Sequence, residues 1–267
     1  MKLISFDLKA DFAFFRKPDT NNTINLSYNI IHRPVVLGIL GAIIGLKGYF
    51  EGYLEEYNDK RKLPQYYEIF KNVKIGVEPL NHEMGNYVKT NIKYSDSTGF
   101  NNKDKDNNPA TRLTEELTLV NPEYRIYLLL DEDDEYQKQL INSIQKGCAE
   151  FIPYFGKNEF TAWWSSESYK EYHFTEQPIL GEKVRIKSIF DKKTILKNNT
   201  EVPFDLFNFD EEETPFIYFE RLPKDFDLAL MQYDIAEFAY SNYFIKNASQ
   251  LDNLFFIDEL NAYVQML

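Results

Sequence analysis

The amino-acid sequence predicts an α+β fold, and three observations lead to that prediction. Apolar residues alternate with polar ones along several segments, as in half-buried strands, whereas in other segments they recur at helical spacing. The chain is 43% hydrophobic and holds 22 Phe and 19 Tyr, which is typical of an aromatic-rich globule that contains sheets. Two alternating segments enclose a long polar stretch, which predicts a projecting β-hairpin.

The first predicted element is a long strand from Ile4 to Phe14, in which the even-numbered residues are apolar. A period of two indicates that one face of this strand lies on the core and the other faces solvent. A polar loop at Pro18–Asn25 and a short segment at Leu26–Ile31 then lead to the first helix.

The first helix is predicted to begin at Pro34, because proline suits the first helical position. Its glycines recur at steps of three, four and three residues along one face: Gly38, Gly41, Gly45 and Gly48. Each glycine inside a helix costs about 1 kcal/mol relative to alanine, so we expect another backbone to approach this face closely. His32 and Arg33 precede the helix, and with its positive dipole end they form a corner that can hold a phosphate.

The middle of the chain is predicted to form a strand at Val73–Val77 and then the long hairpin. The two alternating segments of the hairpin are Asn86–Tyr94 and Arg112–Val120. Between them, Ser95–Ala110 is almost wholly polar and has too little apolar surface to fold on its own.

A buried strand at Tyr124–Leu130 and a second helix follow the hairpin. The apolar residues of that helix recur at steps of four: Tyr136, Leu140, Ile144 and Cys148. Asp131–Asp134 place negative charge at its positive dipole end, and Phe160–Trp164 would supply the next strand. This order of strands and helices predicts a ferredoxin-like (RRM-like) split βαβ unit.

We therefore divide the chain into a ferredoxin-like domain at 1–164, with its hairpin at about 86–120, and a mostly β C-terminal region at 165–267. The C-terminal region is predicted to contain strands at Val184–Ile189, Lys193–Leu196 and Pro215–Phe219. It is predicted to end in two helices, at Asp225–Phe244 and Asp252–Met266.

Composition indicates the cellular setting. The single cysteine, Cys148, excludes a disulfide framework and a thiolate metal cluster, which points to a reducing interior. No leader peptide opens the sequence, and the longest apolar run, Pro34–Leu46, is too short to cross a bilayer. We expect a cytoplasmic protein that does not enter a membrane.

The formal charge of −12 is distributed unevenly along the chain. Residues 201–267 carry 14 acidic and 3 basic residues, a net of −11, which leaves −1 for the first 200. Residues 1–50 instead hold six Lys/Arg against three Asp. A polyanion can therefore approach one end of the molecule while the other end repels it. The alternative is that the C-terminal acids are only a solvated surface.

The sequence contains no strong catalytic motif. None of its three histidines lies at metal-ligand spacing from another, and Cys148 is predicted to be a core residue rather than a nucleophile. His32, near a basic loop, could contact phosphate or act as a general base in RNA cleavage, and the alternative is a structural histidine. The acidic run Asp210–Glu213 is predicted to be an exposed loop rather than a metal site. Of Trp163 and Trp164, an alternating strand would bury one and leave the other to stack on a base.

A tight turn at Ile152–Phe160 is centred on Gly156, where glycine permits positive φ and lets a ligand approach the main chain. Together with cations elsewhere, it forms the candidate binding surface. Its members share a cation or a hydrogen-bond donor and expected access to solvent: Arg16, Lys17, His32, Arg33, Lys89, Lys93, Arg112, Gly156, Lys157 and Asn158.

Four segments in register carry a family resemblance that covers essentially the whole chain. They are Arg33-Pro34 with the LGILGAIIGL helix, the polar-tipped hairpin, the PYFGKNEF turn, and IYFERLP at Ile217–Pro223. With the ferredoxin-like pattern, they resemble the Cas-five family of CRISPR-associated RAMP proteins, and most of all its versions in type I-B Cascade.

The resemblance implies a non-catalytic subunit of a Cascade surveillance complex in antiviral defence. Such a subunit holds the 5′ handle of the CRISPR RNA, caps the filament of backbone subunits, and contacts the large subunit that reads target DNA near the PAM. The resemblance further implies that Arg33-Pro34 and Gly156–Asn158 hold the RNA handle, and that residues 86–120 form a thumb against the guide RNA and a neighbouring subunit. It implies no cofactor and no metal.

Two alternatives remain at this stage. Some relatives in another subtype process precursor RNA with a Tyr, Lys and His set that includes adjacent Lys-His, and this sequence has no Lys-His dipeptide. The runner-up function is nevertheless a metal-independent endoribonuclease that uses His32 with a lysine such as Lys47. The other alternative is a protein-interaction module that binds no RNA.

Overall fold

A computed structural model describes most of the chain, namely residues 1–18, 24–49, 62–96, 112–176, 183–192, 204–209, 214–246, 248 and 251–267. The predicted strand at Lys193–Leu196, the acidic run Asp210–Glu213 and most of the hairpin tip lie outside the described residues.

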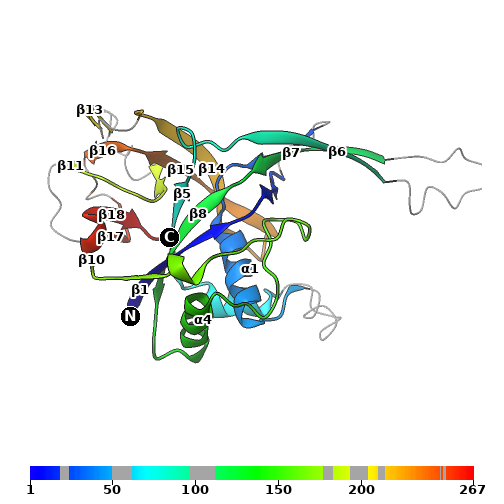
Figure 1. The fold of residues 1–267 in the computed structure, drawn as a ribbon, viewed down its shortest axis with the longest axis horizontal. Helices are drawn as coiled ribbons and strands as arrows, with labels where there is room; N and C mark the ends of the chain where they lie inside the picture. The colour runs from blue at the N-terminus through cyan, green and yellow to red at the C-terminus, as the bar shows by residue number, and fades with distance from the viewer. Residues whose placement is uncertain are drawn as a thin grey trace, which may run out of the picture.

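A four-stranded antiparallel sheet forms the centre of the N-terminal part (Figure 1). Its strands are β1 (Lys2–Lys9), β5 (Lys74–Leu80), β8 (Glu123–Leu130) and β9 (Lys170–Tyr172). They lie in the order β5-β8-β1-β9, and β1 pairs with β8 along its whole length. The predicted strands at Val73–Val77 and Tyr124–Leu130 are therefore confirmed. The first predicted strand, Ile4–Phe14, is confirmed only as far as Lys9, because Phe12–Ala13 form a separate strand in another sheet.

Two longer helices, α1 (Arg33–Ile44) and α4 (Glu135–Lys146), lie on one face of this sheet (Figure 1). The short helix α3 (Gln65–Phe70) packs beside α1. The carboxylate of Asp134 caps α4 by accepting the N–H of Gln137 at 2.9 Å. Their apolar faces join the strands in one large core, to which Phe6, Leu40 and Ile144 contribute.

The other face of the sheet is also covered, so the prediction that the first strand is half-buried is wrong. Ile4 and Phe6 point toward the helices, whereas Leu3 packs with Phe255 and Val264 in a separate cluster. These partners come from a small sheet formed by three strands: β10 (Phe174–Glu176), β17 (Leu254–Ile257) and β18 (Ala262–Gln265). The sequence suggested a half-buried strand because the second face of β1 carries small or polar residues such as Ser5. In the structure Ser5 is nevertheless buried, because apolar layers cover both faces of the sheet.

The predicted hairpin is confirmed and extends away from the body (Figure 1). Its strands are β6 (Lys89–Asp96) and β7 (Arg112–Val120), paired from Lys89/Leu119 to Asp96/Arg112. Three short strands attach the other edge of β7 to the body: β2 (Phe12–Ala13), β3 (Phe15–Arg16) and β4 (Ile24–Tyr28). We call these five strands the hairpin sheet.

Phe160–Trp164 is not the fourth strand of the central sheet, as was predicted. It makes only isolated bridges, from Thr161 to Tyr154 and from Trp163 to Lys9, and β9 takes the sheet edge instead. The indole N–H of Trp164 donates to the carbonyl of Ile144 at 2.9 Å, which holds this segment against the end of α4. Trp164 is buried and Trp163 is exposed, as the alternation predicted.

Cys148 is exposed, so its predicted place in the core is wrong. Helix α4 ends at Gly147, which adopts φ 66°, and Cys148 therefore lies beyond the helix rather than on its apolar face.

Both predicted C-terminal helices are wrong, because their residues form strands. Residues 217–246 fold as β14 (Ile217–Asp227), β15 (Gln232–Ser241) and β16 (Tyr243–Lys246). The segment 252–266 contains β17 and β18, joined by a single 3₁₀ turn at Asp258–Leu260. In the first case Met231 turns the chain at φ 52°, and aromatic residues such as Phe226 and Tyr233 pair across the resulting hairpin.

The remaining strands of the C-terminal part are short. They are β11 (Lys183–Val184), β12 (Phe190–Asp191) and β13 (Phe204–Phe209). β12 extends the β14–β15 hairpin, and β11 and β13 flank β16. Among the residues described, no helix is long and apolar enough to span a membrane.

Candidate nucleic-acid interface

The hairpin sheet and the turn at Gly156–Asn158 bring together eight of the ten predicted binding residues. Arg16 and Lys17 lie at β3, and Lys89, Lys93 and Arg112 lie on β6 and β7. The ion pair from Lys157 to Glu116 on β7 places the turn against the root of the hairpin. The side chain of Arg112 lies outside the described residues.

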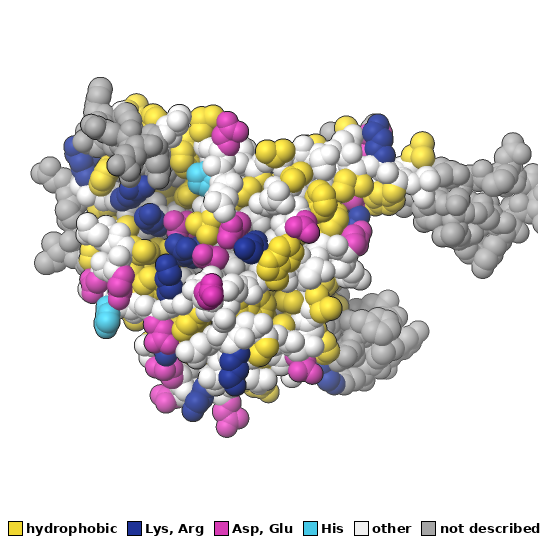
Figure 2. Space-filling view, in the orientation of Figure 1, with side chains coloured by type: hydrophobic (Ala, Val, Ile, Leu, Met, Phe, Trp, Pro, Cys, Tyr) yellow, Lys and Arg dark blue, Asp and Glu magenta, His cyan; other side chains and the backbone are white. Residues whose placement is uncertain are grey.

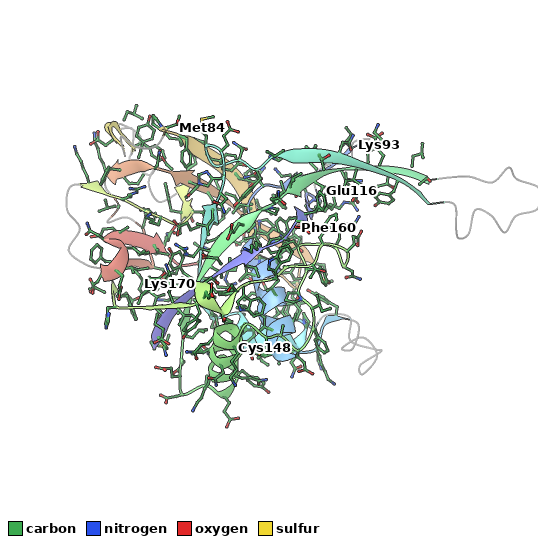
Figure 3. All side chains as sticks on the ribbon, viewed as in Figure 1. Met84, Lys93, Glu116, Cys148, Phe160 and Lys170 are labelled. Atoms are coloured by element: carbon green, nitrogen blue, oxygen red, sulfur yellow. The ribbon has the colours of Figure 1, made fainter. Side chains whose placement is uncertain are left out.

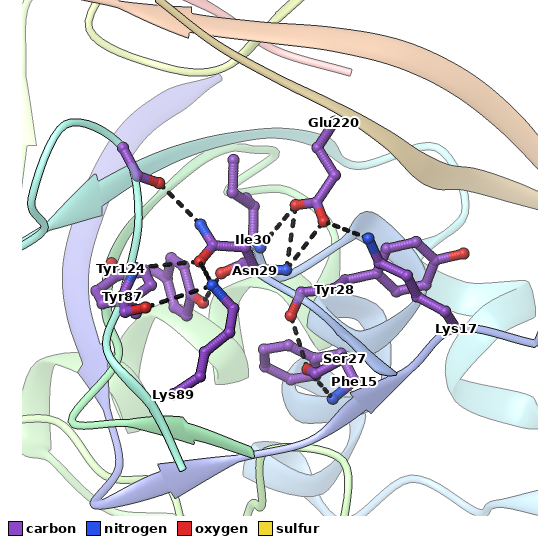
Figure 4. A network of polar contacts seen from close by, with 11 residues as sticks. Phe15, Lys17, Ser27, Tyr28, Asn29, Ile30, Tyr87, Lys89, Tyr124 and Glu220 are labelled. Atoms are coloured by element: carbon purple, nitrogen blue, oxygen red, sulfur yellow. Dashed lines mark hydrogen bonds and ion pairs between the residues drawn. The ribbon is translucent and has the colours of Figure 1, made fainter. Parts of the chain in front are cut away.

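Two of these cations serve the fold itself, in a buried network around Asn29 and Glu220 (Figure 4). The Glu220 carboxylate accepts the backbone N–H groups of Asn29 and Ile30 and pairs with the ammonium group of Lys17 at 3.0 Å. The ammonium group of Lys89 donates to Asn29 Oδ1 at 3.0 Å. Burial lowers the pKa of Lys89. Lys17 and Lys89 therefore connect the hairpin root and β14 to the core.

Lys157 forms a second cluster on the hairpin, which we call the Lys157 clamp. Its ammonium group lies 2.7 Å from Glu116 Oε2 and 4.8 Å from the centre of the Tyr94 ring, and the Tyr94 hydroxyl donates to Glu116 Oε1 at 2.8 Å. Burial by itself would lower the pKa of Lys157, but its bonds to Glu116 and Glu159 raise that pKa above the ordinary value. Figure 3 shows Glu116 on the hairpin and Phe160 beneath the hairpin root.

Gly156 adopts the predicted positive φ, at 86°. The need for glycine here is explained by a contact within the chain rather than by a ligand. A Cβ atom at this position would lie 2.0 Å from the carbonyl oxygen of Phe14. The close approach that the glycine permits is thus made by the backbone between β2 and β3 of the same molecule.

The accessible donors of the predicted set are Arg16, Lys93 and Asn158. Arg16 and Asn158 are exposed, and Arg16 has no ion-pair partner within the part of the chain that the structure describes. Lys93 is 67% exposed and pairs with Glu115 at 3.0 Å on the open side of the hairpin (Figure 3). Across the visible face of the molecule, Lys and Arg side chains are interspersed with Asp and Glu rather than gathered in one basic patch (Figure 2).

His32 and Arg33 are buried, so the prediction of an accessible cationic corner is wrong. The Arg33 guanidinium donates to the carbonyls of Lys71, Val73 and Leu267. Burial lowers the pKa of His32 from 6.5 to about 3, so the ring is neutral. Phe15, Tyr28 and Tyr233 surround His32, and its Nδ1 atom is buried without a hydrogen bond.

The other two histidines hold defined structural contacts. His82 Nδ1 accepts the N–H of Gly85 at 3.0 Å, so in the neutral ring Nε2 carries the proton and lies 3.0 Å from the Tyr240 hydroxyl. His173 Nδ1 lies 2.8 Å from a carboxylate oxygen of Glu259 on the surface. Among the described residues, no group of three or more His, Cys, Asp or Glu side chains could hold a metal ion.

The glycine face of α1 receives an aromatic side chain rather than another backbone. A Cβ atom on Gly41 would lie 2.4 Å from Cβ of Tyr66 on α3, and Gly45 ends the helix at φ 76°. Gly48 lies beyond the helix. The glycine spacing thus indicated a close contact correctly, but the partner is a tyrosine of the neighbouring helix.

No protein-family model and no curated protein matches this sequence. Several solved structures are distantly similar. A chain of a CRISPR RNA-guided surveillance complex is 11% identical with a TM-score of 0.47, covering 91% of this chain and 92% of that one. A CRISPR protein from Archaeoglobus fulgidus is 10% identical with a TM-score of 0.46, covering 99% and 98%. A chain of the Type III-B Cmr-beta complex bound to cognate target RNA and AMPPnP is 14% identical with a TM-score of 0.45, covering 92% and 86%.

Proposed function

We propose that this protein is a non-catalytic, RNA-binding subunit of a type I-B CRISPR Cascade complex that works in the cytoplasm. In this role it holds the 5′ handle of the CRISPR RNA, caps the filament of backbone subunits, and contacts the large subunit near the PAM of the target DNA. The observation that carries the proposal is the hairpin sheet, in which a projecting two-stranded arm is anchored to the body and exposes cations.

The arrangement of the central sheet supports this proposal. Its elements follow the order β1-α1-β5-β8-α4-β9, and its strands lie in the order β5-β8-β1-β9 with every pair antiparallel. This is the order of a ferredoxin-like split βαβ unit. We infer that the N-terminal part is such a domain, with β9 as its last strand and the hairpin as its thumb.

The small number of accessible cations is consistent with a subunit that shares its RNA with neighbours. Lys17, Lys89 and Lys157 are half-buried and bonded within their own chain, whereas the pair that Lys93 makes with Glu115 is exposed. Among the described residues, the RNA backbone can therefore reach the cations Arg16 and Lys93 and the neutral donor Asn158. In an assembly the phosphate contacts are distributed over several chains, so each chain needs few cations.

The runner-up, an endoribonuclease that uses His32, receives no support from the site. A general base must come within hydrogen-bonding distance of the hydroxyl that it deprotonates. His32 is 5% exposed and enclosed by aromatic rings, so a ribose hydroxyl cannot reach it.

Neutralising two accessible cations tests the proposed RNA contact. We expect Arg16→Gln/Lys93→Gln to bind a labelled 5′-handle RNA about tenfold more weakly than the unsubstituted protein in fluorescence anisotropy. Each phosphate contact contributes about 0.7 to the slope of log K against log salt for single strands, so losing two should reduce the slope by about 1.4.

The matched control is Lys138→Gln/Lys146→Gln, which removes the same charge from exposed positions on α4. We expect its affinity and salt slope to equal those of the unsubstituted protein. Equal losses in both double variants would show a general charge effect and contradict the proposed interface. No binding of the handle RNA by any of the three proteins, alone or with its partner subunits, would refute the function.

A further inference from the structure

A groove of about 560 Å³ runs between α1, α3, the segment before Gly156 and the β14–β15 hairpin. Its volume falls within the range of about 300–1,000 Å³ that holds small ligands. Gly156 lies at its edge, so the groove is continuous with the turn at Gly156–Asn158. Apart from Gly156, its lining residues were not among the predicted binding residues. The high tyrosine content of the sequence indicated only that aromatic surfaces were available.

The floor of the groove is a smooth helix surface. It consists of one face of α1, where Pro34, Gly38 and Ala42 offer little or no side chain. A Cβ atom on Gly38 would lie 3.9 Å from the Tyr66 ring, in ordinary van der Waals contact, so the Tyr66 ring borders this position. The ring thus forms an aromatic edge beside the helix face.

The walls of the groove are rich in tyrosine. Five tyrosines line it, and three of them are well exposed: Tyr49 at 53%, Tyr154 at 45% and Tyr233 at 39%. Burial raises the pKa of Tyr66 above its ordinary range, and the nearby phenols of Tyr49, Tyr233 and Tyr154 raise it further. All five tyrosines line the same groove, and the ring centres of Tyr66 and Tyr67 lie 6.2 Å apart.

The charge of the groove suits a polyanion. Among its described lining residues are Lys47 and no Asp or Glu, although the whole protein has a charge of −12 and 42 acidic residues. In an acidic protein, a lining whose described residues hold a lysine and no carboxylate repels a phosphate chain less than the rest of the surface does, although Asp225 bonds the hydroxyl of Tyr67 nearby. Aromatic faces stack on any base, and phenol hydroxyls can bond to base edges.

We propose that this groove binds an unstacked nucleobase of single-stranded RNA, which stacks on Tyr154 and its neighbouring tyrosines while its backbone passes the rim at Gly156–Asn158. The inference rests on the proposed function, because it names where a base of the bound RNA goes. An apolar segment of a partner protein is the competing occupant. It is less suited to the groove, because an apolar segment has no negative charge for Lys47.

Two substitutions and one control test the groove in the full-length protein. Tyr154→Ala removes a stacking surface, and Gly38→Leu fills the floor at a helical position where leucine is favoured over glycine. Tyr136→Ala is the matched control, because Tyr136 is 42% exposed on α4 and does not line the groove. The probes are a fluorescein-labelled eight-nucleotide RNA and the same RNA with one abasic position, moved along the strand.

We expect Tyr154→Ala and Gly38→Leu to weaken binding of the intact RNA about tenfold without changing the salt slope, since stacking rather than phosphate contact is lost. Tyr136→Ala should bind as the unsubstituted protein does. One abasic position should weaken binding by the unsubstituted protein and have no further effect in the two groove variants. RNA that carries 5-iodouridine at that position should crosslink to a groove tyrosine.

Equal RNA affinity in all variants, with binding by the unsubstituted protein intact, would overturn the groove inference and leave the proposed function standing. If the groove variants bound RNA as the unsubstituted protein does but no longer bound a partner subunit, the groove would hold a protein segment, and the groove inference would again be overturned. No RNA binding by the unsubstituted protein would refute the proposed function and the groove together.

Discussion

His32 is almost completely enclosed by aromatic side chains, with 5% of its surface exposed. Its ring meets Phe15, Tyr28 and Tyr233 edge-on, and its Nδ1 atom is buried without a partner. Because burial disfavours the charged ring, the pKa falls from 6.5 to about 3. His32, the candidate general base of the sequence analysis, is thus a neutral, buried structural residue.

This burial predicts a pH dependence of stability. Between pH 6.5 and about 3 the unfolded chain binds a proton on His32 that the folded protein does not, so the free energy of unfolding falls as the pH is lowered. At pH 5 the loss from this residue is about 2 kcal/mol, from about 1.36 kcal/mol for each pH unit below the unfolded pKa. Urea unfolding at pH 7 and pH 5 measures it.

We expect His32→Phe to lose about 2 kcal/mol less than the unsubstituted protein between the two pH values. Carboxylates titrate in both proteins, so the difference between them isolates the histidine. An identical pH dependence in the two proteins would contradict the neutral, buried state of His32.

Besides the pairing of β7 with β2 and β4, two polar clusters hold the hairpin at its root. The Asn29 network anchors β6 to the body through Lys89, and the Lys157 clamp anchors β7 through Glu116 (Figure 4 shows the first). Glu116 is 7% exposed in its side chain, so an unpaired carboxylate there is costly. Both clusters thus orient the arm.

Removing the cation of the Lys157 clamp should loosen the arm. We expect Lys157→Met to destabilise the protein by about 2 kcal/mol, because it leaves Glu116 buried without its ion pair. Amide hydrogen exchange in β6 and β7 should accelerate before that of the central sheet.

The control for the clamp is Lys93→Met, which breaks the exposed pair with Glu115 on the open side of the hairpin. Exposed pairs contribute little, so its stability should change by less than about 0.5 kcal/mol. Equal effects of the two substitutions on hairpin exchange would refute the orienting role of Lys157.

At the scale of the whole molecule, Leu267 is joined to β5 and to the start of α1. Leu267 exchanges backbone hydrogen bonds with Ile75 at 3.0 and 2.9 Å, and its carbonyl accepts from Arg33 Nε at 3.3 Å. Arg33 also bonds the carbonyls of Lys71 and Val73. One guanidinium thus ties together the start of α1, the segment before β5 and the C-terminal strands.

Arg33 should therefore matter for folding and not for RNA. We expect Arg33→Met to lower the free energy of unfolding by about 3 kcal/mol, because the carbonyls of Lys71 and Val73 lose their guanidinium donor, whereas that of Leu267 keeps the N–H of Ile75. At a temperature where the variant remains folded, its affinity for handle RNA should be unchanged.

Arg16→Met gives the opposite pattern, with stability within about 0.5 kcal/mol of the unsubstituted protein and weaker RNA binding. Urea unfolding and fluorescence anisotropy on both variants separate the two roles. If folded Arg33→Met lost RNA binding, Arg33 would contact the RNA, and its purely structural role would be contradicted.

Local patterns determined much of this protein. Proline and glycine mark the start and end of α1, alternation marks the hairpin arms and the strands of the central sheet, and the glycine spacing indicates a close contact. These features depend on neighbours within a few residues, which a sequence displays directly. The C-terminal helices failed because strand pairing across β14 and β15, rather than the local pattern, decides that segment.

Access to solvent was decided by the tertiary structure. The sequence identifies Arg33, Lys17 and Arg16 equally as cations, yet the first is enclosed by Leu267, 234 positions away, the second pairs with Glu220, and the third stays open. The tyrosine groove likewise joins residues from α1, α3 and β15 that no local pattern relates. A side chain's type is encoded at its own position, whereas its burial and partners depend on long-range packing, and so the chemistry was predictable and its accessibility was not.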